Sequence, residues 1–257
     1  MTIIACCLTP SDVILVADAV GVETLPVTRG LPAEEFTIAR KIRYLPKAQK
    51  YLAIEGDRLL ADAIDYLAWW ERDAEFETDI TTPIGLENLL QCHKHLRQAL
   101  GNYWNKRGDR LDPPTPSTIV LASGKGLEVQ RFELHDVEND SEGIVLSRRH
   151  ELKEGMTTIF YGHSWNTLSI APEDSATSLN DLVDHMVRFH ATATARGEGL
   201  GYPDLGNRFS GIRISRGSGL FVERMNPYHS FLDLIYGHVG GAENWKILRQ
   251  GCGWSPR

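Results

Sequence analysis

The first residues of the chain combine a threonine with a segment that would hold it in place. In MTIIACCLTPSDVILVAD the apolar run begins at Ile3, so Thr2 lies at the very edge of a packed element, although chain ends usually fray. A threonine hydroxyl is a weak nucleophile that needs a base beside it. Once Met1 is removed, the free α-amine of Thr2, with a reference pKa of about 8, would be such a base. The segment is therefore either an ordinary edge strand or the part of the protein that carries the catalytic nucleophile.

The pattern of apolar residues predicts the elements that would position this threonine. Alternating or short apolar runs between turn residues predict strands over residues 2–8, 13–17, 42–45, 51–54, 118–122, 127–134, 144–147, 157–161, 212–215 and 220–223. Helical spacing predicts helices around residues 60–70, 86–100 and 179–190. The stretch with Pro26, Gly30 and Pro32 is expected to be a loop.

The order of these elements indicates the class of fold. Strands and helices come in separate runs, which is typical of an α+β fold rather than of a doubly wound parallel sheet. Two sheets between helix layers, a four-layer αββα sandwich, would bury all three apolar helix stripes and the strand faces. The chain of 257 residues has room for such a core.

Composition excludes several classes of function. The net charge of −7 disfavours nonspecific binding to nucleic acid. The four cysteines have no Cys-x-x-Cys spacing, which favours a reducing compartment. We see no signal peptide, and no apolar run approaches the roughly 20 residues of a membrane span. We therefore expect a cytoplasmic protein without membrane or nucleic-acid partners.

Two sequence blocks carry a resemblance to a known family. In TIIACCLTPSDVILVAD, Asp18 follows Thr2 by sixteen residues, and in KIRYLPKAQKYLAIEGDRLLADA, Lys41 opens a hairpin that ends at Gly56 before a helix. A weaker third block, NRFSG, supplies Ser210. The chain thereby resembles the N-terminal nucleophile (Ntn) hydrolases, and more narrowly the proteasome β subunits and HslV. The likeness extends over roughly residues 2–223.

The resemblance implies a role for each of these residues. Thr2 would be the nucleophile, and Lys41 would place a positive charge near its hydroxyl. Asp18 would hold and balance that lysine. The backbone N–H of Gly56 would stabilise the tetrahedral oxyanion, and Ser210 would hydrogen-bond the α-amine. No cofactor and no metal ion are implied.

The chain also departs from the family pattern. Asn207 stands where an aspartate is expected, His163 where a serine is expected, and Ala19 follows the aspartate in place of serine. An Ntn-hydrolase domain over residues 1–225 would be followed by an extension, 226–257, packed on the domain or at a subunit interface.

The resemblance favours a hydrolase that cleaves amide bonds, as a peptidase in a homo-oligomeric ring with an ATP-dependent unfoldase as a further partner. A small-molecule amidase of the same fold remains open. So does a catalytically decayed structural subunit, which the substitutions at Asn207, His163 and Ala19 favour.

Plainer interpretations of the same residues stay open. Asp18 could simply end a strand, Lys41 could be a solvated edge charge, and Gly56 could be only a strand-to-helix turn. Cys92, His93 and His95 suggest a metal site, but His93 and His95 lie on different faces of the expected helix. His93 falls in the apolar stripe and is expected to be a core histidine.

Overall fold

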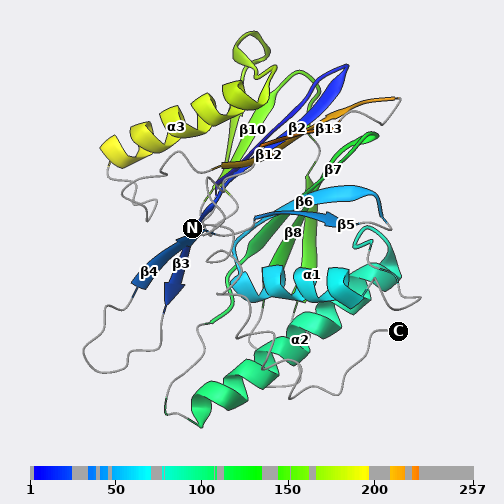
Figure 1. Cartoon of the computed structure of the whole chain (residues 1–257), viewed down its shortest axis with the longest axis vertical. Helices are drawn as coiled ribbons and strands as arrows, with labels where there is room; N and C mark the ends of the chain where they lie inside the picture. Colours follow the sequence, from blue (N-terminus) through cyan, green and yellow to red (C-terminus); the bar gives the residue numbers. More distant parts are fainter. Residues whose placement is uncertain are drawn as a thin grey trace.

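The computed structural model describes residues 3–24, 34–38, 41–45, 48–70, 77, 79–106, 108, 113–134, 144–150, 152–161, 166–196, 209–217 and 222–225. They form an α+β fold with two large antiparallel sheets and three α-helices (Figure 1). The predicted α+β class is therefore confirmed for this part of the chain. None of the helices described has the length and apolar character that a membrane crossing requires.

The first sheet carries the N-terminal strand at its centre. From edge to edge its six strands are β11 (Asn166–Ile170), β10 (Thr157–Tyr161), β1 (Ile3–Leu8), β2 (Asp12–Asp18), β12 (Phe209–Ser215) and β13 (Val222–Met225). Its neighbouring strands are all antiparallel. In register, Ile4 lies opposite Ala17 and Ala17 opposite Ser210. Segments far apart in the sequence therefore reach the same end of this sheet.

The second sheet carries the Lys41 hairpin at one edge. Its five antiparallel strands are, in order, β5 (Ile42–Leu45), β6 (Lys50–Glu55), β7 (Ser117–Ser123), β8 (Gly126–Leu134) and β9 (Ile144–His150). A separate two-stranded sheet pairs β3 (Val20–Thr24) with β4 (Glu34–Ile38).

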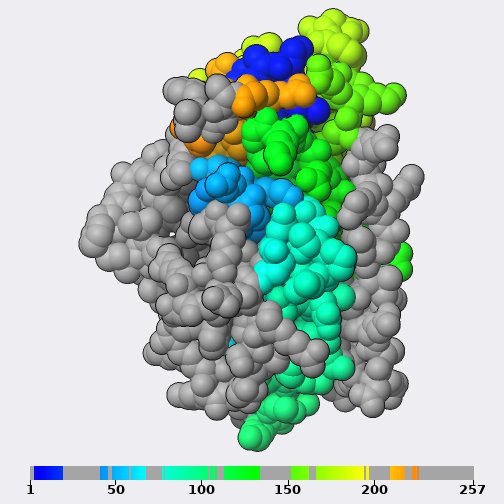
Figure 2. Space-filling view, turned by 90° about the vertical axis from the view of Figure 1, so that its right-hand side faces the viewer, coloured from blue at the N-terminus to red at the C-terminus, as the bar shows by residue number. Residues whose placement is uncertain are grey.

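Three helices cover the outer faces of the two sheets. α3 (Leu179–Ala195) packs on the six-stranded sheet, and α1 (Arg58–Trp70) and α2 (Pro83–Asn105) pack on the five-stranded sheet. A short 3₁₀-helix, η2 (Pro172–Asp174), precedes α3. Figure 2 shows the resulting layers from the side: the blue and orange strands lie above the green and light-blue ones, with the cyan and teal helices below.

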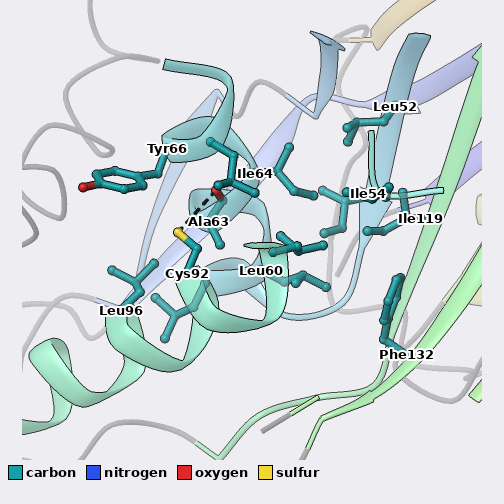
Figure 3. Close-up of a cluster of buried hydrophobic side chains, with 14 of the residues drawn as sticks. Leu52, Ile54, Leu60, Ala63, Ile64, Tyr66, Cys92, Leu96, Ile119 and Phe132 are labelled. Carbon is teal, nitrogen blue, oxygen red and sulfur yellow. Dashed lines mark hydrogen bonds between the residues drawn. The ribbon is translucent and has the colours of Figure 1, made fainter. Parts of the chain in front are cut away.

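Three apolar clusters fill the spaces between the layers. The first joins α1 and α2 to the five-stranded sheet, where Leu60 and Ile64 face Ile54 and Ile119 (Figure 3). The second joins α3 to β1, β2 and β10. The third lies between the sheets, and strand alternation sends neighbouring residues to different clusters. Ile3 packs toward α3, for example, and Ile4 packs between the sheets.

The structure adds strands that the sequence patterns did not predict. β11 has a mostly exposed sequence, Asn166–Ile170, that lacks an alternating apolar pattern. β3 and β4 flank the predicted loop, whose Pro26, Gly30 and Pro32 lie outside the described residues. The expected mixed tail, residues 226–257, also lies outside them.

Candidate active site

Asp18 holds two groups at the end of β2. Its side chain is fully buried. Oδ1 accepts a hydrogen bond from the backbone N–H of Ile3 at 2.6 Å, and Oδ2 accepts one from Lys41 Nζ at 2.6 Å. The Ile3 nitrogen is the peptide nitrogen that joins residue 3 to Thr2. One carboxylate therefore fixes both the buried cation and the peptide bond that follows the proposed nucleophile.

Lys41 is buried rather than solvated. Only 7 % of the residue is exposed, and its ammonium forms the ion pair with Asp18. Burial lowers the pKa of Lys41, because it penalises the charged form. The Arg43 cation lowers this pKa further. The Asp18 carboxylate, and to a smaller extent Glu55, act to raise it. The solvated interpretation of Lys41 is therefore wrong. Arg43 is also buried, and its Nε donates to Asp65 on α1 at 2.5 Å.

Gly56 occupies a turn that only glycine fits. It follows β6 directly and its φ is +108°, in the region that side chains rarely adopt. A Cβ at this position would lie 2.4 Å from the Pro116 carbonyl oxygen and 2.6 Å from Ser117 Oγ. α1 begins two residues later, at Arg58. The turn thus directs the chain from the sheet into the helix with its backbone tightly enclosed.

Asp57 anchors this turn to α1 and to the neighbouring strand. Its Oδ1 accepts a hydrogen bond from the Leu60 N–H at 3.1 Å, which caps the first turn of α1. Its own N–H donates to Ser117 Oγ at 2.8 Å. The Gly56 turn is therefore fixed on both sides, by α1 and by β7.

Asp57 also contacts two side chains of α2. His93 Nε2 lies 3.4 Å from Oδ1, and Arg97 Nη1 lies 3.8 Å from Oδ2. His93 is fully buried, as expected for a core histidine, but it faces a carboxylate rather than apolar neighbours alone. Burial acts to raise the pKa of Asp57, yet His93, the Leu60 N–H and Arg97 together hold it below its usual value.

Ser210 lies on β12 and is buried. It is opposite Ala17, one residue before Asp18, and in the same cross-strand row as Ile4. This register brings the third sequence block to the end of the sheet where Asp18 lies. Thr2, His163 and Asn207 lie outside the described residues. The roles of these residues, and the hydrogen bond between Ser210 and the α-amine, stay predictions.

Glu55 was not identified from the sequence. It ends β6, adjoins Gly56 and is only 2 % exposed. Burial raises its pKa to about 8, against the opposing effects of Thr118 and Arg131. The signal was a glutamate ending the apolar run Leu52–Ile54, where an acidic side chain is costly to bury.

The cysteine and histidine residues of α2 have other partners. Cys92 is buried in the first apolar cluster, and its thiol donates to the Ala63 carbonyl oxygen at 3.6 Å (Figure 3). Within the described ranges there is no group of three side chains that could hold a metal ion.

No protein-family model and no curated protein matches the sequence. Among solved structures, Anbu (ancestral beta-subunit) from Yersinia bercovieri is similar over 99 % of this chain and 100 % of its own, with 10 % identity and a TM-score of 0.43. The helical assembly of the Anbu complex from Pseudomonas aeruginosa gives 8 % identity and a TM-score of 0.44 over 100 % of this chain and 98 % of its own. Scores this low establish neither family nor activity.

Proposed function

We propose that this protein is an N-terminal threonine hydrolase of the Ntn class, similar to proteasome β subunits, that cleaves amide bonds. The observation that carries the proposal is the pair of contacts made by Asp18. Its carboxylate holds the Lys41 ammonium and the amide nitrogen bonded to residue 2. The plainer interpretation of the N-terminal segment as an edge strand is wrong, because β1 lies between β10 and β2. A strand with a purely structural role has no need of a buried ion pair at this place, since burying two charges costs desolvation energy.

The proposed reaction divides amide cleavage into two steps. The Thr2 hydroxyl oxygen attacks the substrate carbonyl carbon while its proton passes to the α-amine. Lys41 lies beside this centre and stabilises the developing negative oxygen, and the Gly56 N–H binds the tetrahedral oxyanion. Collapse expels the amine product with that proton and leaves an ester on Thr2. Water then hydrolyses the ester and restores the hydroxyl.

The enclosed Gly56 turn supports the oxyanion role. An oxyanion donor must be fixed before the reaction, because a mobile N–H would have to be reorganised as charge develops. The Gly56 backbone is held by Ser117 on one side and by the capped start of α1 on the other. Such rigidity is what this step requires.

A covalent probe tests the proposal directly. A peptide epoxyketone reacts with both the hydroxyl and the amine of an N-terminal threonine, so it reports Met1 removal and nucleophilicity together. We expect one adduct per wild-type chain by intact mass, on the tryptic or chymotryptic peptide that begins at Thr2. Thr2→Ala should remain unlabelled, whereas Thr192→Ala, at an exposed position on α3, should label like wild type.

Two further results decide between an active enzyme and a decayed subunit. Asp18→Asn keeps the size of the side chain and removes its charge, so we expect slower labelling of a folded protein. Retention of Met1, or a folded wild type that is not labelled, would instead favour the non-catalytic structural subunit.

Assembly into a homo-oligomeric ring in the cytoplasm is part of the same proposal. It follows from the resemblance described in the sequence, and the mass of the purified particle by light scattering tests it. Peptide substrates are favoured if the particle is a closed ring, because a ring admits only extended chains. A monomer that hydrolyses small amides would point to the amidase.

A further inference from the structure

Glu55 lies between the two sheets, next to the turn that carries the proposed oxyanion donor. Two residues earlier on β6, Ala53 belongs to the apolar cluster between the sheets, and alternation places Glu55 on the same face. Across the sheet, Glu55 is opposite Thr118 and Thr118 is opposite Arg131. The three residues therefore form one polar row that ends an otherwise apolar interface.

This row contains buried polar atoms whose hydrogen bonding is incomplete. Within the described part of the chain, neither Glu55 Oε1 nor Thr118 Oγ1 has a well-formed hydrogen bond, although the Thr118 hydroxyl is close enough to Glu55 to act against the rise of its pKa. Both residues are almost fully buried. Folded proteins rarely keep such atoms unless the group has a further role. A glutamine or an apolar residue would fill the same space without the cost of burying an acid.

Three charged groups act on Glu55, in decreasing order of effect: Arg131, the N-terminal amine and Lys41. Lys41, immediately before β5, and Arg131, on β8, both favour its ionised form. Lys41 is itself held by Asp18 from the opposite sheet, and it is also influenced by Arg43. The electrostatic effect between Glu55 and Lys41 is reciprocal.

The strands of the six-stranded sheet contribute their apolar residues to the cluster between the sheets. Cys6 belongs to this cluster, and burial raises the pKa of its thiol, which therefore stays neutral.

We propose that Glu55 is a positioning residue of the site, a second buried carboxyl group that acts with Asp18 to fix the place and the charge of Lys41. The array of Asp18, Lys41 and Glu55 rests on the buried Asp18–Lys41 pair and on the strand register: Ile42 is opposite Ala53, so Lys41 and Glu55 lie at the same end of the β5–β6 pair. Its consequence for catalysis rests on the proposed function.

The array changes protonation in a defined order. Below about pH 8, Glu55 holds its proton, and the Lys41 ammonium is paired with Asp18. When the pH rises through this value, the proton leaves Glu55, and the new carboxylate stabilises the adjacent ammonium. This carboxylate opposes the lowering of the Lys41 pKa by burial and so helps to protect the charge on Lys41. Replacing Glu55 by glutamine removes this protection.

Infrared difference spectroscopy measures this protonation whether or not the protein is an enzyme. We expect wild type at pH 7 to show the C=O stretch of a buried protonated carboxyl group and to lose it through about pH 8. Glu55→Gln should lack this band, and Glu133→Gln, at an exposed position on β8, should keep it. Absence of the band in wild type, or its persistence in Glu55→Gln, would overturn the array.

A second substitution tests the coupling to Lys41. In Lys41→Met the band should persist to higher pH, because a cation that favours ionisation of Glu55 is gone. Lys125→Met, in the exposed turn between β7 and β8, should leave the titration unchanged. An unchanged titration in a folded Lys41→Met protein would overturn the proposal.

The catalytic consequence is measured separately, as the pH profile of epoxyketone labelling. In Glu55→Gln the alkaline limb should move to lower pH, whereas Glu133→Gln should match wild type. An unshifted limb in Glu55→Gln, beside the expected infrared result, would overturn the catalytic role and keep the array. Failure of wild type to label would count against the proposed function, and the infrared results would still decide the array.

Discussion

Two buried carboxyl groups flank Gly56, and their pKa values are shifted in opposite directions. Glu55 and Asp57 are 2 % and 8 % exposed, and in both cases burial acts to raise the pKa. The pKa of Glu55 reaches about 8, whereas that of Asp57 falls below its usual value. The difference lies in their partners. Asp57 accepts the Leu60 N–H and meets both His93 and Arg97, whereas Glu55 Oε1 has no hydrogen-bond partner among the described residues.

The comparison separates two uses of a buried acid. Donors that surround Asp57 keep it ionised, and the ionised group ties β6, α1 and α2 together. Glu55 has a weaker set of partners and is left close to a change of charge near neutral pH. A residue of the second kind, in a site with a buried lysine, is a better candidate for function than one of the first kind.

The largest effect is expected from removing Asp57. Asp57→Ala deprives buried Arg97 and His93 of their carboxylate and removes the cap of α1, so we expect a loss of about 3–5 kcal/mol in the free energy of unfolding. Urea denaturation at pH 7 measures this loss, with Asp174→Ala, in exposed η2, as the control. Since its folded pKa is lowered, the contribution of Asp57 is present above about pH 4 and disappears as the pH falls through that lowered pKa. A loss below about 1 kcal/mol would show that the network adds little.

A smaller effect, centred on activity, is expected at Gly56. In Gly56→Ala the new Cβ meets Pro116 O and Ser117 Oγ at a positive φ, so the turn must shift and take its N–H with it. We expect labelling of Thr2 to slow by about 10²–10³-fold, the effect of losing one oxyanion donor. Gly101→Ala on α2 is the matched control, because its Cβ would meet nothing within 4 Å. Equal labelling rates would remove Gly56 from the site.

The smallest expected effect is a change in how steeply the free energy of unfolding depends on pH. The folded pKa of Glu55 is raised, so its contribution to stability is complete below the ordinary glutamate pKa of 4.5 and is lost as the pH rises through about 8. Between these values the free energy of unfolding of wild type should fall relative to that of Glu55→Gln, by at most about 1.4 kcal/mol per pH unit. Thermal or urea unfolding from pH 5 to 9 gives the two slopes, and Glu133→Gln should follow wild type. Parallel slopes for wild type and Glu55→Gln would mean that the carboxyl ionises normally.

The sequence predicted the layers because their signals are local. Strand alternation and helical stripes follow from the residues themselves, and they placed β1, β2, β5 to β8 and all three helices within a few residues. β11 was missed because an edge strand with exposed side chains needs no apolar pattern. Its formation depends on pairing with β10, which lies outside any short window of sequence.

The site could be predicted only for residues that belong to the sequence blocks shared with the Ntn hydrolases. The family resemblance implied that Asp18 would hold Lys41, and the two side chains are in contact. The partnership of Asp57 with His93 and Arg97 depends on how α2 crosses α1, which no motif records. Glu55 was missed because the sequence does not show which face of β6 is covered. Only the position of the second sheet reveals that this glutamate is buried between the sheets.

The Asp18 carboxylate also determines how precisely the start of β1 and the Lys41 side chain are positioned relative to each other. Its two oxygens belong to one rigid planar group, and each is taken by a different partner, the Ile3 N–H and the Lys41 ammonium. The distance between the Ile3 backbone nitrogen and the Lys41 ammonium is therefore set by one rigid carboxylate rather than by two independent side chains. Any displacement of β2 carries both partners along, so their mutual spacing survives small movements of the strand.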